Sequence, residues 1–242
     1  NGTLNAGDFS FKLTGDGNVN ETVTNKANGK INFSTLSFDK AGVYNYTVKE
    51  VAGTNSDVDY DAMTINVKVT VTKDANTGLL SASTVMTSSG GEATDANDRV
   101  FNNYVVPPVP VNVNFTKALA GRTLVAGEFT FEMKDENGVV VATGTNDEHG
   151  VVTFNQLPEV KNAQVGKVIK YKVTEKVPAN KEFGVTYDNM VAEVSVTVSK
   201  NADHTLKATV TYPGGDTEFN NVVTPPTEPK FQPEKFIVNK KK

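Results

Sequence analysis

The chain has 242 residues, of which 38% are hydrophobic, and its 28 acidic and 24 basic side chains give a formal charge of −4. This mild charge disfavours binding to nucleic acid or to an anionic membrane surface. The absence of cysteine excludes disulfides, thiolate metal sites and thiol nucleophiles. No apolar run approaches the roughly 18 residues of a membrane span, and no secretory leader begins at Asn1, so we expect an excerpt or a trimmed mature form.

The chain contains two copies of one sequence pattern. In chain order, the first copy runs LNAGDFSFKL, NGKINFSTL, GVYNYTVKE, VDYDAMTINVKVTV and RVFNNYVV. The second copy runs LVAGEFTFEM, HGVVTFNQL, KVIKYKVTE, VTYDNMVAEVSVTV and TEFNNVVT. A repeat of this length marks separate structural units, so we predict domains at residues 1–105 and 111–223. The proline-rich segments 105–111 and 224–233 predict stiff, extended linkers.

Apolar and polar residues alternate along most of these segments. A period of two predicts strands around residues 9–13, 44–48, 65–71, 129–133 and 194–198. Turn-forming sequences such as GDGN, DANTG, DENG and PGGD separate the strands, and no long stretch has the helical period. We therefore predict an all-β protein with two tandem immunoglobulin-like β-sandwich domains joined by a Pro-rich linker.

The same alternation directs one polar side chain on each of three strands of the second domain towards the core: Lys117, Glu175 and Asn221. Taken singly, each is most simply a strand-end side chain that reaches water. Taken together they are harder to accommodate, because an isolated ion in an apolar core costs several kcal/mol. The three residues are tolerable in a core only if the charges of the lysine and the glutamate are removed.

A reaction among the three removes the charges. Burial lowers the pKa of a lysine and raises that of a glutamate, so Lys117 and Glu175 can both be neutral at pH 7. The neutral amine can then attack the carbonyl of Asn221 while the protonated acid polarises that carbonyl and shuttles protons. Loss of ammonia leaves a Lys–Asn isopeptide amide, and the reaction needs no cofactor and no separate enzyme.

The first domain repeats two of the three residues. Glu50 and Asn103 match the glutamate and the asparagine, whereas the strand that bears the lysine is missing. The alternation predicts that Asn103 shares its inner face with Phe101 and Val105. In each copy the preceding asparagine, Asn102 or Asn220, is the competing electrophile, although it faces the other way in the alternation.

Four segments of the second copy also resemble a known family. FTKALAGRTLVAGEFTFEM, YKVTE, YDNMVAEVSVTV and EFNN are similar to the isopeptide-linkage repeats of Gram-positive pilus shafts and surface adhesins, including streptococcal-type pilins. The resemblance implies an immunoglobulin-like fold of the collagen-adhesin B type, with a Lys–Asn bond between the first and last strands and a glutamate beside it. By motif, Lys117 is the nucleophile, Glu175 the proton shuttle and Asn221 the electrophile.

Residues 224–242 read as a linker followed by the start of another copy. Phe236, Val238 and Lys240 alternate as the residues before Lys117 do. We therefore expect Lys240 to supply the amine for Asn103, with Glu50 as catalyst, on a strand from a neighbouring copy of the protein or from an adjacent repeat. Donation of this kind builds a head-to-tail polymer. A solvated basic tail is the alternative.

Other chemistries have less support in the sequence. His149 and His204 fall in separate turns where surface positions are expected, so an enzyme acting on an external substrate is not expected. The acidic segments 57–61 and 145–150 lack the spacing of a known calcium loop, and no metal or cofactor is predicted. The favoured function is a structural segment of a fibre on the bacterial surface. The alternative is an adhesin module that binds a host protein or sugar through its loops.

Overall fold

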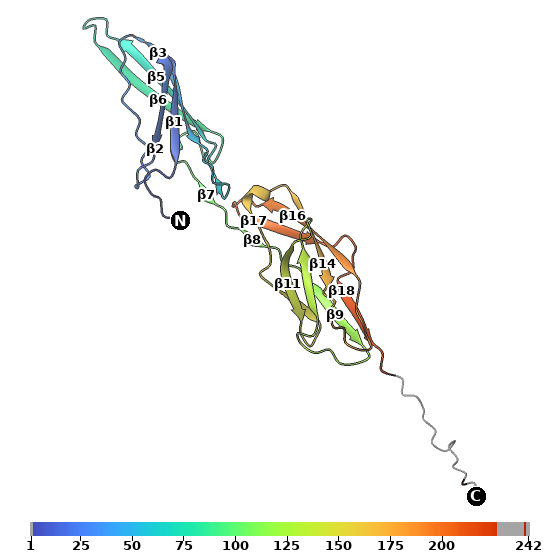
Figure 1. The fold of residues 1–242 in the computed structure, drawn as a ribbon. Coiled ribbons are helices and arrows are strands. Elements are labelled where there is room, and N and C mark those ends of the chain that lie inside the picture. Colours follow the sequence, from blue (N-terminus) through green and yellow to red (C-terminus); the bar gives the residue numbers. More distant parts are fainter. Residues whose placement is uncertain (1, 227–239, 241–242) are drawn as a thin grey trace. The chain divides into compact units, whose positions relative to one another are not determined.

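A computed structural model describes residues 2–226 and residue 240 of the chain. The predicted strand residues Phe236 and Val238 lie outside the described residues. The described chain divides into two compact units (Figure 1). The first contains the residues up to Pro107 with the short segments Lys161–Ala163 and Asn201–Thr205, and the second contains the remaining residues from Pro108 on.

Strands dominate both units, and the only helical elements in the described chain are two three-residue 3₁₀ turns, Asp16–Asn18 and Asn162–Gln164. The prediction of an all-β protein with two tandem domains is confirmed. The strands form where the period-two alternation lies, because alternate side chains of a strand point to opposite faces.

The second unit is built on one sheet of nine strands in the order β15-β18-β9-β12-β11-β10-β14-β16-β17. Their bounds are β9 Phe115–Ala120, β10 Thr130–Lys134, β11 Val140–Asn146, β12 Val151–Asn155, β14 Val168–Glu175, β15 Val185–Thr186, β16 Val191–Lys200, β17 Leu206–Thr211 and β18 Glu218–Val223. A second, two-stranded sheet pairs β8 Val109–Pro110 with β13 Glu159–Val160.

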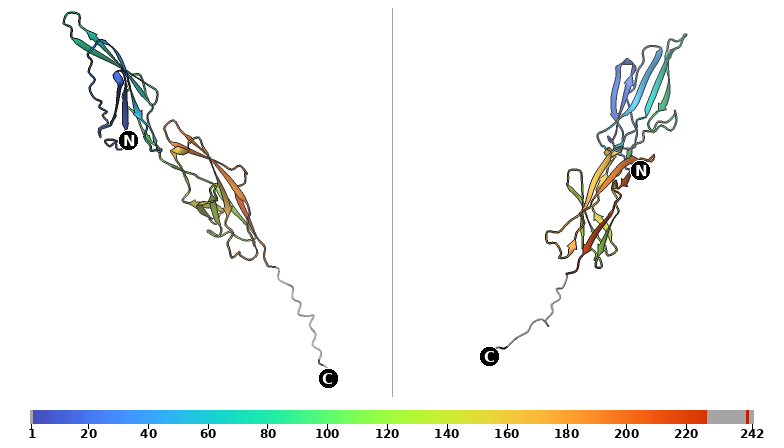
Figure 2. Two further views of the ribbon diagram at one scale, coloured as in Figure 1. Left: turned by 45° about the horizontal axis from the view of Figure 1, so that its top comes forward. Right: turned by 90° about the vertical axis from the view of Figure 1, so that its right-hand side faces the viewer.

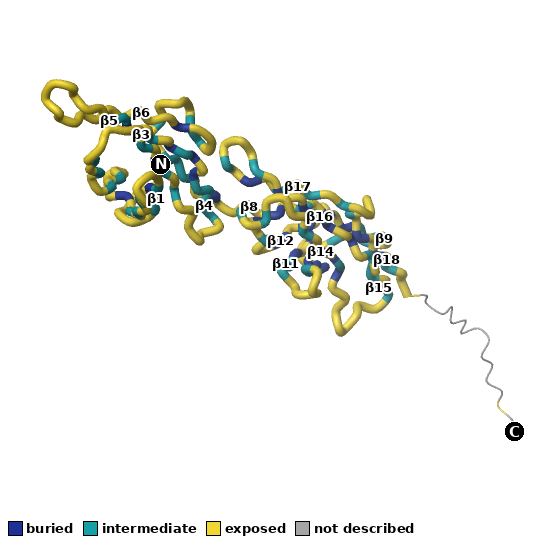
Figure 3. Tube along the Cα trace, turned by 90° about the horizontal axis from the view of Figure 1, so that it is seen from above, coloured by how far each residue is buried: buried dark blue, intermediate teal, exposed yellow. Residues whose placement is uncertain are grey.

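The nine-stranded sheet closes over a single core. Phe219 on β18 and Phe131 on β10 have ring centroids 5.0 Å apart, although β9, β12 and β11 lie between their strands in the sheet order. The sheet must therefore fold back so that its two halves face each other, as in a sandwich. Figure 3 shows the buried positions of this unit along β9, β14, β16 and β18.

The first unit has a smaller and more open sheet, in the order β2-β1-β3-β5-β6 (Figure 2). Its strands are β1 Ser10–Gly15, β2 Val19–Thr24, β3 Gly42–Val51, β5 Thr64–Lys73 and β6 Leu80–Ser89, and β4 Val58–Asp59 pairs with β7 Tyr104–Val105 in a separate sheet. Its largest buried hydrophobic cluster holds Leu13, Tyr46, Val69 and Val71.

The two units differ around one strand. In the second unit β9 lies between β12 and β18 and so joins the two halves of the sheet. The described part of the first unit has no strand at the matching position, and its segments 31–36 and 99–103, which correspond to the neighbours of β9, belong to no strand. A strand forms only where a partner pairs with it. The absence of the central strand thus accounts for the loss of both neighbours.

The proline-rich linker is held at each end by its own unit. The Val106 N–H donates to the Asp57 carbonyl at 2.8 Å, and the Val111 N–H donates to the Pro158 carbonyl at 2.8 Å. Val106 is buried, whereas Val105 is 75% exposed. The prediction that Val105 shares the inner face with Asn103 is therefore wrong, because the chain turns inward at Val106 instead.

Candidate functional site

The three polar residues predicted for the second core meet inside it. The Lys117 Nζ lies 2.8 Å from Glu175 Oε2, and the Asn221 Nδ2 donates to Glu175 Oε1 at 2.7 Å. All three residues are buried. One carboxylate thus contacts both the amine and the amide.

The sheet explains this convergence. Strands β9 and β18 are parallel neighbours in which Phe219 pairs with Lys117, so Asn221 lies two residues further along on the same face. Glu175 ends β14 in the opposite half of the sheet and reaches the pair across the core. The turn before β12 also passes close to the lysine, since a Cβ at Gly150 would lie 2.3 Å from the Lys117 carbonyl oxygen. Only glycine fits this approach.

Opposing effects act on the pKa of the Lys117 amine. Burial lowers the pKa of Lys117, and the hydrogen bond and charge of Glu175 act in the opposite direction. The Nζ also lies 4.6 Å from the centroid of the Phe129 ring. A lower pKa increases the fraction of unprotonated amine, which is the nucleophilic form.

The orientation of Asn221 is fixed by a backbone group. The Asp188 N–H donates to Asn221 Oδ1 at 2.7 Å. Because an N–H can only donate, the atom that faces it must be the oxygen, which leaves Nδ2 facing Glu175. The sequence led us to expect the acid of Glu175 to polarise the Asn221 carbonyl, and the structure shows a different arrangement. The carboxyl group contacts the nitrogen that would leave, and the carbonyl oxygen is bound by Asp188.

Asp188 was not among the residues predicted from the sequence. Its carboxylate accepts hydrogen bonds from the N–H groups of Met190 at 2.8 Å and Asn220 at 2.6 Å. The exposed Asn220 side chain turns away and donates to the Glu218 carbonyl at 3.1 Å. A signal for Asp188 was present, since YDAM in the first copy and YDNM in the second share the aspartate.

A second pair of buried polar residues was also missed. Asn25 and Asn146 are buried, and each accepts a 2.8 Å hydrogen bond, from the Phe9 and Phe129 N–H groups respectively. Each also donates to two backbone carbonyls. Both residues hold the AGDF or AGEF turn in place and lie outside the triad formed by Lys117, Glu175 and Asn221.

The first unit contains an incomplete version of the same site. The Asp61 N–H donates to Asn103 Oδ1 at 3.0 Å, as Asp188 does in the second unit. Both carboxylate oxygens of Glu50 are buried without a hydrogen-bond partner among the described residues. Burial raises the pKa of Glu50 to about 7, although the nearby Asn103 side chain and Asp61 N–H, which are not within hydrogen-bonding geometry, partly oppose the shift. The predicted amine of this site, Lys240, is exposed and lies in no strand.

Other candidate sites are less developed. His149 is exposed as expected, whereas His204 is half-buried. The described residues contain no group of three or more His, Cys, Asp or Glu side chains placed to bind a metal. None of the described helical segments has the length and apolar character needed to cross a membrane.

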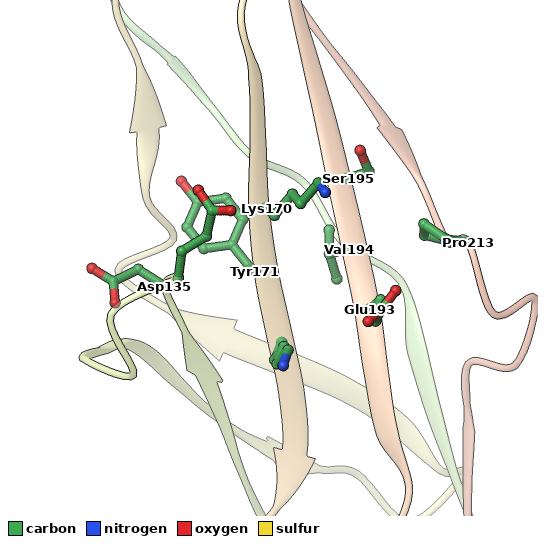
Figure 4. Close-up of a pocket in the computed structure, with 9 residues that line it drawn as sticks. Asp135, Lys170, Tyr171, Glu193, Val194, Ser195 and Pro213 are labelled. Atoms are coloured by element: carbon green, nitrogen blue, oxygen red, sulfur yellow. The ribbon is translucent and has the colours of Figure 1, made fainter.

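A surface hollow of about 320 Å³ lies on the second unit (Figure 4). Side chains of both charges line it: Asp135, Glu136, Lys170, Lys172 and Glu193, together with Tyr171, Val194, Ser195 and Pro213. None of the triad residues borders the hollow, and its single aromatic residue, Tyr171, is buried. The hollow therefore provides no aromatic groove of the kind that would support the adhesin alternative.

The fold and the buried triad define a protein built from tandem immunoglobulin-like repeats. The chain belongs to the family of Spy0128-like isopeptide containing domains (FctA), whose model matches residues 2–105 and again residues 113–224. The two matches correspond to the two internal copies.

Solved structures with similar chains include two bacterial pilus proteins. The major pilin protein T3.2 of Streptococcus pyogenes is 19% identical, with a TM-score of 0.35 over 91% of this chain and 90% of that chain. A C-terminal fragment of the pilus adhesin SpaC of Lactobacillus rhamnosus GG is 14% identical, with a TM-score of 0.36 over 89% and 87%. No match was found among curated proteins. The family match, covering both copies, carries the assignment.

Proposed function

We propose that this chain is a structural segment of a bacterial cell-surface pilus or fibre, reinforced by an autocatalytic isopeptide bond between Lys117 and Asn221. The observation that carries the proposal is the buried carboxylate of Glu175, whose two oxygens contact the attacking and the leaving nitrogen at 2.8 and 2.7 Å. Membership of an isopeptide-containing family supports the same chemistry. The resemblance of its motifs to pilus repeats supports the fibre.

The reaction follows from this contact. Lys117 transfers a proton to Glu175 Oε2, and the neutral amine attacks the Asn221 carbonyl carbon. The carboxyl group then gives this proton to Nδ2, and the Cγ–Nδ2 bond breaks with release of ammonia. Glu175 takes up the second proton that Nζ must lose, so it ends as a neutral acid beside the new amide. Each site reacts once, so the protein is its own substrate and not an enzyme with turnover.

The position of the bond suits a mechanical role. Among the nine strands of the sheet, β9, which bears Lys117, comes first in the chain and β18, which bears Asn221, comes last. These two strands are parallel neighbours in the sheet. A bond between them encloses nearly the whole unit in a covalent loop. Tension applied at the ends of the unit then passes through the bond and leaves the enclosed residues folded.

We also propose that the first unit is completed by an added strand. Its Gly29 matches Gly150, yet a Cβ there would meet only the Leu4 side chain, at 3.5 Å. The space that the Lys117 backbone fills in the second unit is thus open in the first. Phe33 and Phe101 are only half-buried, whereas their counterparts Phe154 and Phe219 are buried.

The chemistry of this open position fits a lysine-bearing strand. Glu50 presents a buried carboxylate without a hydrogen-bond partner among the described residues, and Asn103 is held by Asp61. A strand with the pattern of Phe236, Val238 and Lys240 brings apolar side chains for the core and an amine for Glu50. Strand addition at an unpaired sheet edge is a common mode of protein association. The strand comes from a neighbouring copy or from an adjacent repeat.

Intact mass under denaturing conditions tests the first bond. We expect the chain to weigh less than its sequence by one ammonia, and Glu175→Gln to restore the full mass. The matched control is Glu50→Gln, which removes the equivalent glutamate of the other unit and leaves the loss unchanged. A wild-type chain at full mass, with a free Lys117 amine in its peptide map, contradicts the proposal.

A denaturing gel tests the second bond. If neighbouring copies donate the strand, the purified chain forms a ladder that survives boiling in detergent, and Lys240→Ala abolishes it. Lys117→Ala serves as the control, because it removes the bond within a unit and leaves the ladder. If an adjacent repeat donates the strand, separate chains form no ladder, and an extended chain with a further copy loses one more ammonia. Strand donation would be refuted if the purified chain formed no ladder and the extended chain lost no further ammonia.

A further inference from the structure

The hydrogen bond between the Asp188 N–H and Asn221 Oδ1 has a role that the triad does not explain. We infer that the Asp188 N–H stabilises the oxyanion formed during isopeptide synthesis, and that the Asp188 carboxylate is a positioning residue that holds this N–H in place. The inference rests on the proposed function, because it concerns the same reaction.

The geometry suits an oxyanion donor. The Asp188 nitrogen lies 2.7 Å from Oδ1 of the unreacted amide, so a donor is already directed at the oxygen on which negative charge develops. When the amine attacks, the electrons of the C=O bond move onto Oδ1. Asn221 is buried, and a fixed donor is worth more at such a site than in water. Glu175 hydrogen-bonds to the nitrogen of this amide. The negative charge that develops on Oδ1 is therefore stabilised by the Asp188 N–H.

The carboxylate fixes the donor relative to the electrophile. One Asp188 oxygen accepts the Met190 N–H at 2.8 Å, which closes the turn that carries the donor. The other accepts the Asn220 N–H at 2.6 Å, on the residue immediately before Asn221. The loop and strand β18 are thereby joined at the point of reaction.

The first unit has the same arrangement without a lysine. The Asp61 N–H donates to Asn103 Oδ1 at 3.0 Å, and the Asp61 carboxylate accepts the N–H groups of Met63 and Asn102, both at 2.8 Å. The arrangement therefore does not depend on a Lys–Glu pair. It presents the amide in a reactive orientation before an amine arrives.

The atoms of the reaction balance with this assignment. The Nζ–Cγ bond forms, and Nζ gives two protons to the Glu175 carboxyl group, of which one passes on to Nδ2 and one stays on the acid. The C=O bond reforms as the Cγ–Nδ2 bond breaks and ammonia leaves. The Asp188 N–H remains hydrogen-bonded to the same oxygen, which is now the carbonyl of the isopeptide.

Deletion of the single N–H is the direct test. In cell-free synthesis of the full chain, stop-codon suppression replaces Asp188 with its α-hydroxy acid, which keeps the side chain and substitutes an ester oxygen for the N–H. After a short synthesis pulse, ammonia loss is followed by intact mass. We expect the reaction to slow on the order of 100-fold. The same replacement at Asp61 is the matched control and should leave the rate at Asn221 unchanged.

A second pair of variants tests the positioning role. Asp188→Asn places an amide NH₂ against a backbone N–H and loses one of the two hydrogen bonds, so we expect bond formation to slow by about 10-fold. Asn146→Ala removes a buried turn-holding residue outside the triad. It should lower resistance to protease without slowing bond formation. Equal slowing in both variants would show that Asp188 acts only through stability.

The outcomes separate the inference from the proposed function. If the wild-type chain never loses ammonia, the proposed function fails. If the wild-type chain reacts and the ester variant reacts at the same rate, only the inference is overturned. If the ester variant does not fold, as judged by protease resistance, the comparison of Asp188→Asn with Asn146→Ala decides.

Discussion

At the scale of single residues, Lys117 and Glu175 form a buried ion pair whose side chains have no exposed surface. Removing one partner of such a pair leaves an uncompensated charge, whereas replacing both by apolar residues is often tolerated. The stability of the unit and the chemistry of the bond therefore make different demands on these residues.

Variants without the crosslink reveal this difference. Asn221→Ala keeps the ion pair and cannot react, so it is the reference. Relative to it, we expect Lys117→Met to lower the free energy of unfolding by about 3–5 kcal/mol, and Lys117→Met with Glu175→Leu to regain most of that loss. Urea unfolding of the three proteins measures the effect. Equal stability of the reference and the single lysine variant would argue against a buried charge on Glu175.

Glu50 makes a pH-dependent prediction for the first unit. Its pKa is about 7 in the folded chain, against an ordinary value of 4.5 for a glutamate, so the folded protein holds the proton more tightly than the unfolded chain does. Stability contributed by the protonated acid is full below pH 4.5, falls as the pH rises towards 7, and stays lost above it. We expect Glu50→Gln to raise the melting temperature of the first unit at pH 8, by about 4–8 °C for each kcal/mol regained.

The control for this experiment is the same substitution measured at pH 4. There Glu50 is protonated in the folded chain and mostly protonated in the unfolded chain, so Glu50→Gln should change the melting temperature little. A stabilisation of equal size at both pH values would mean that the buried charge is not its cause.

At the scale of strands, the first unit offers a position between segments 31–36 and 99–103 that its described residues leave unfilled. Met86 on β6 is 42% exposed. Its counterpart in the second unit, Tyr212, packs edge-on against Phe115 of β9 with ring centroids 5.3 Å apart. An added strand would cover Met86 in the same way.

Hydrogen exchange tests this expectation. A synthetic peptide of residues 234–242, added to a chain that ends at Thr224, should increase amide protection in segments 31–36 and 99–103, because both gain a strand partner. A peptide with Phe236 and Val238 changed to serine keeps the lysine and should protect neither segment. Protection that is equal for the two peptides would indicate a charge interaction and no strand addition.

The period-two alternation predicted the strands and the three inward polar residues correctly, because a strand fixes which face each side chain occupies. It could not predict the direction in which Asn221 binds its partners. That direction depends on a backbone N–H of a loop that is distant in sequence. The alternation also placed Val105 wrongly on the inner face, because the linker turns inward at Val106, whose N–H donates to the Asp57 carbonyl.

At the scale of the whole molecule, we expect the two units to respond differently to a stretching force. The Lys117–Asn221 bond would close a loop of about 100 residues and restrict the unfolded chain by about 4–5 kcal/mol in the entropic model. The first unit has no such bond in the described chain. Stability and extensibility should therefore differ between two units of the same family.

Single-molecule stretching of the full chain measures this difference. In the wild type the residues between Lys117 and Asn221 are bypassed by the bond, so only the first unit should unfold under tension. In Glu175→Gln the second unit should also unfold and add about 350 Å, from about 100 residues at about 3.5 Å each. Glu50→Gln is the matched control, and it should add no second unfolding step because the bond of the second unit stays intact. A wild-type chain that extends as far as Glu175→Gln would mean that tension does not pass through the bond.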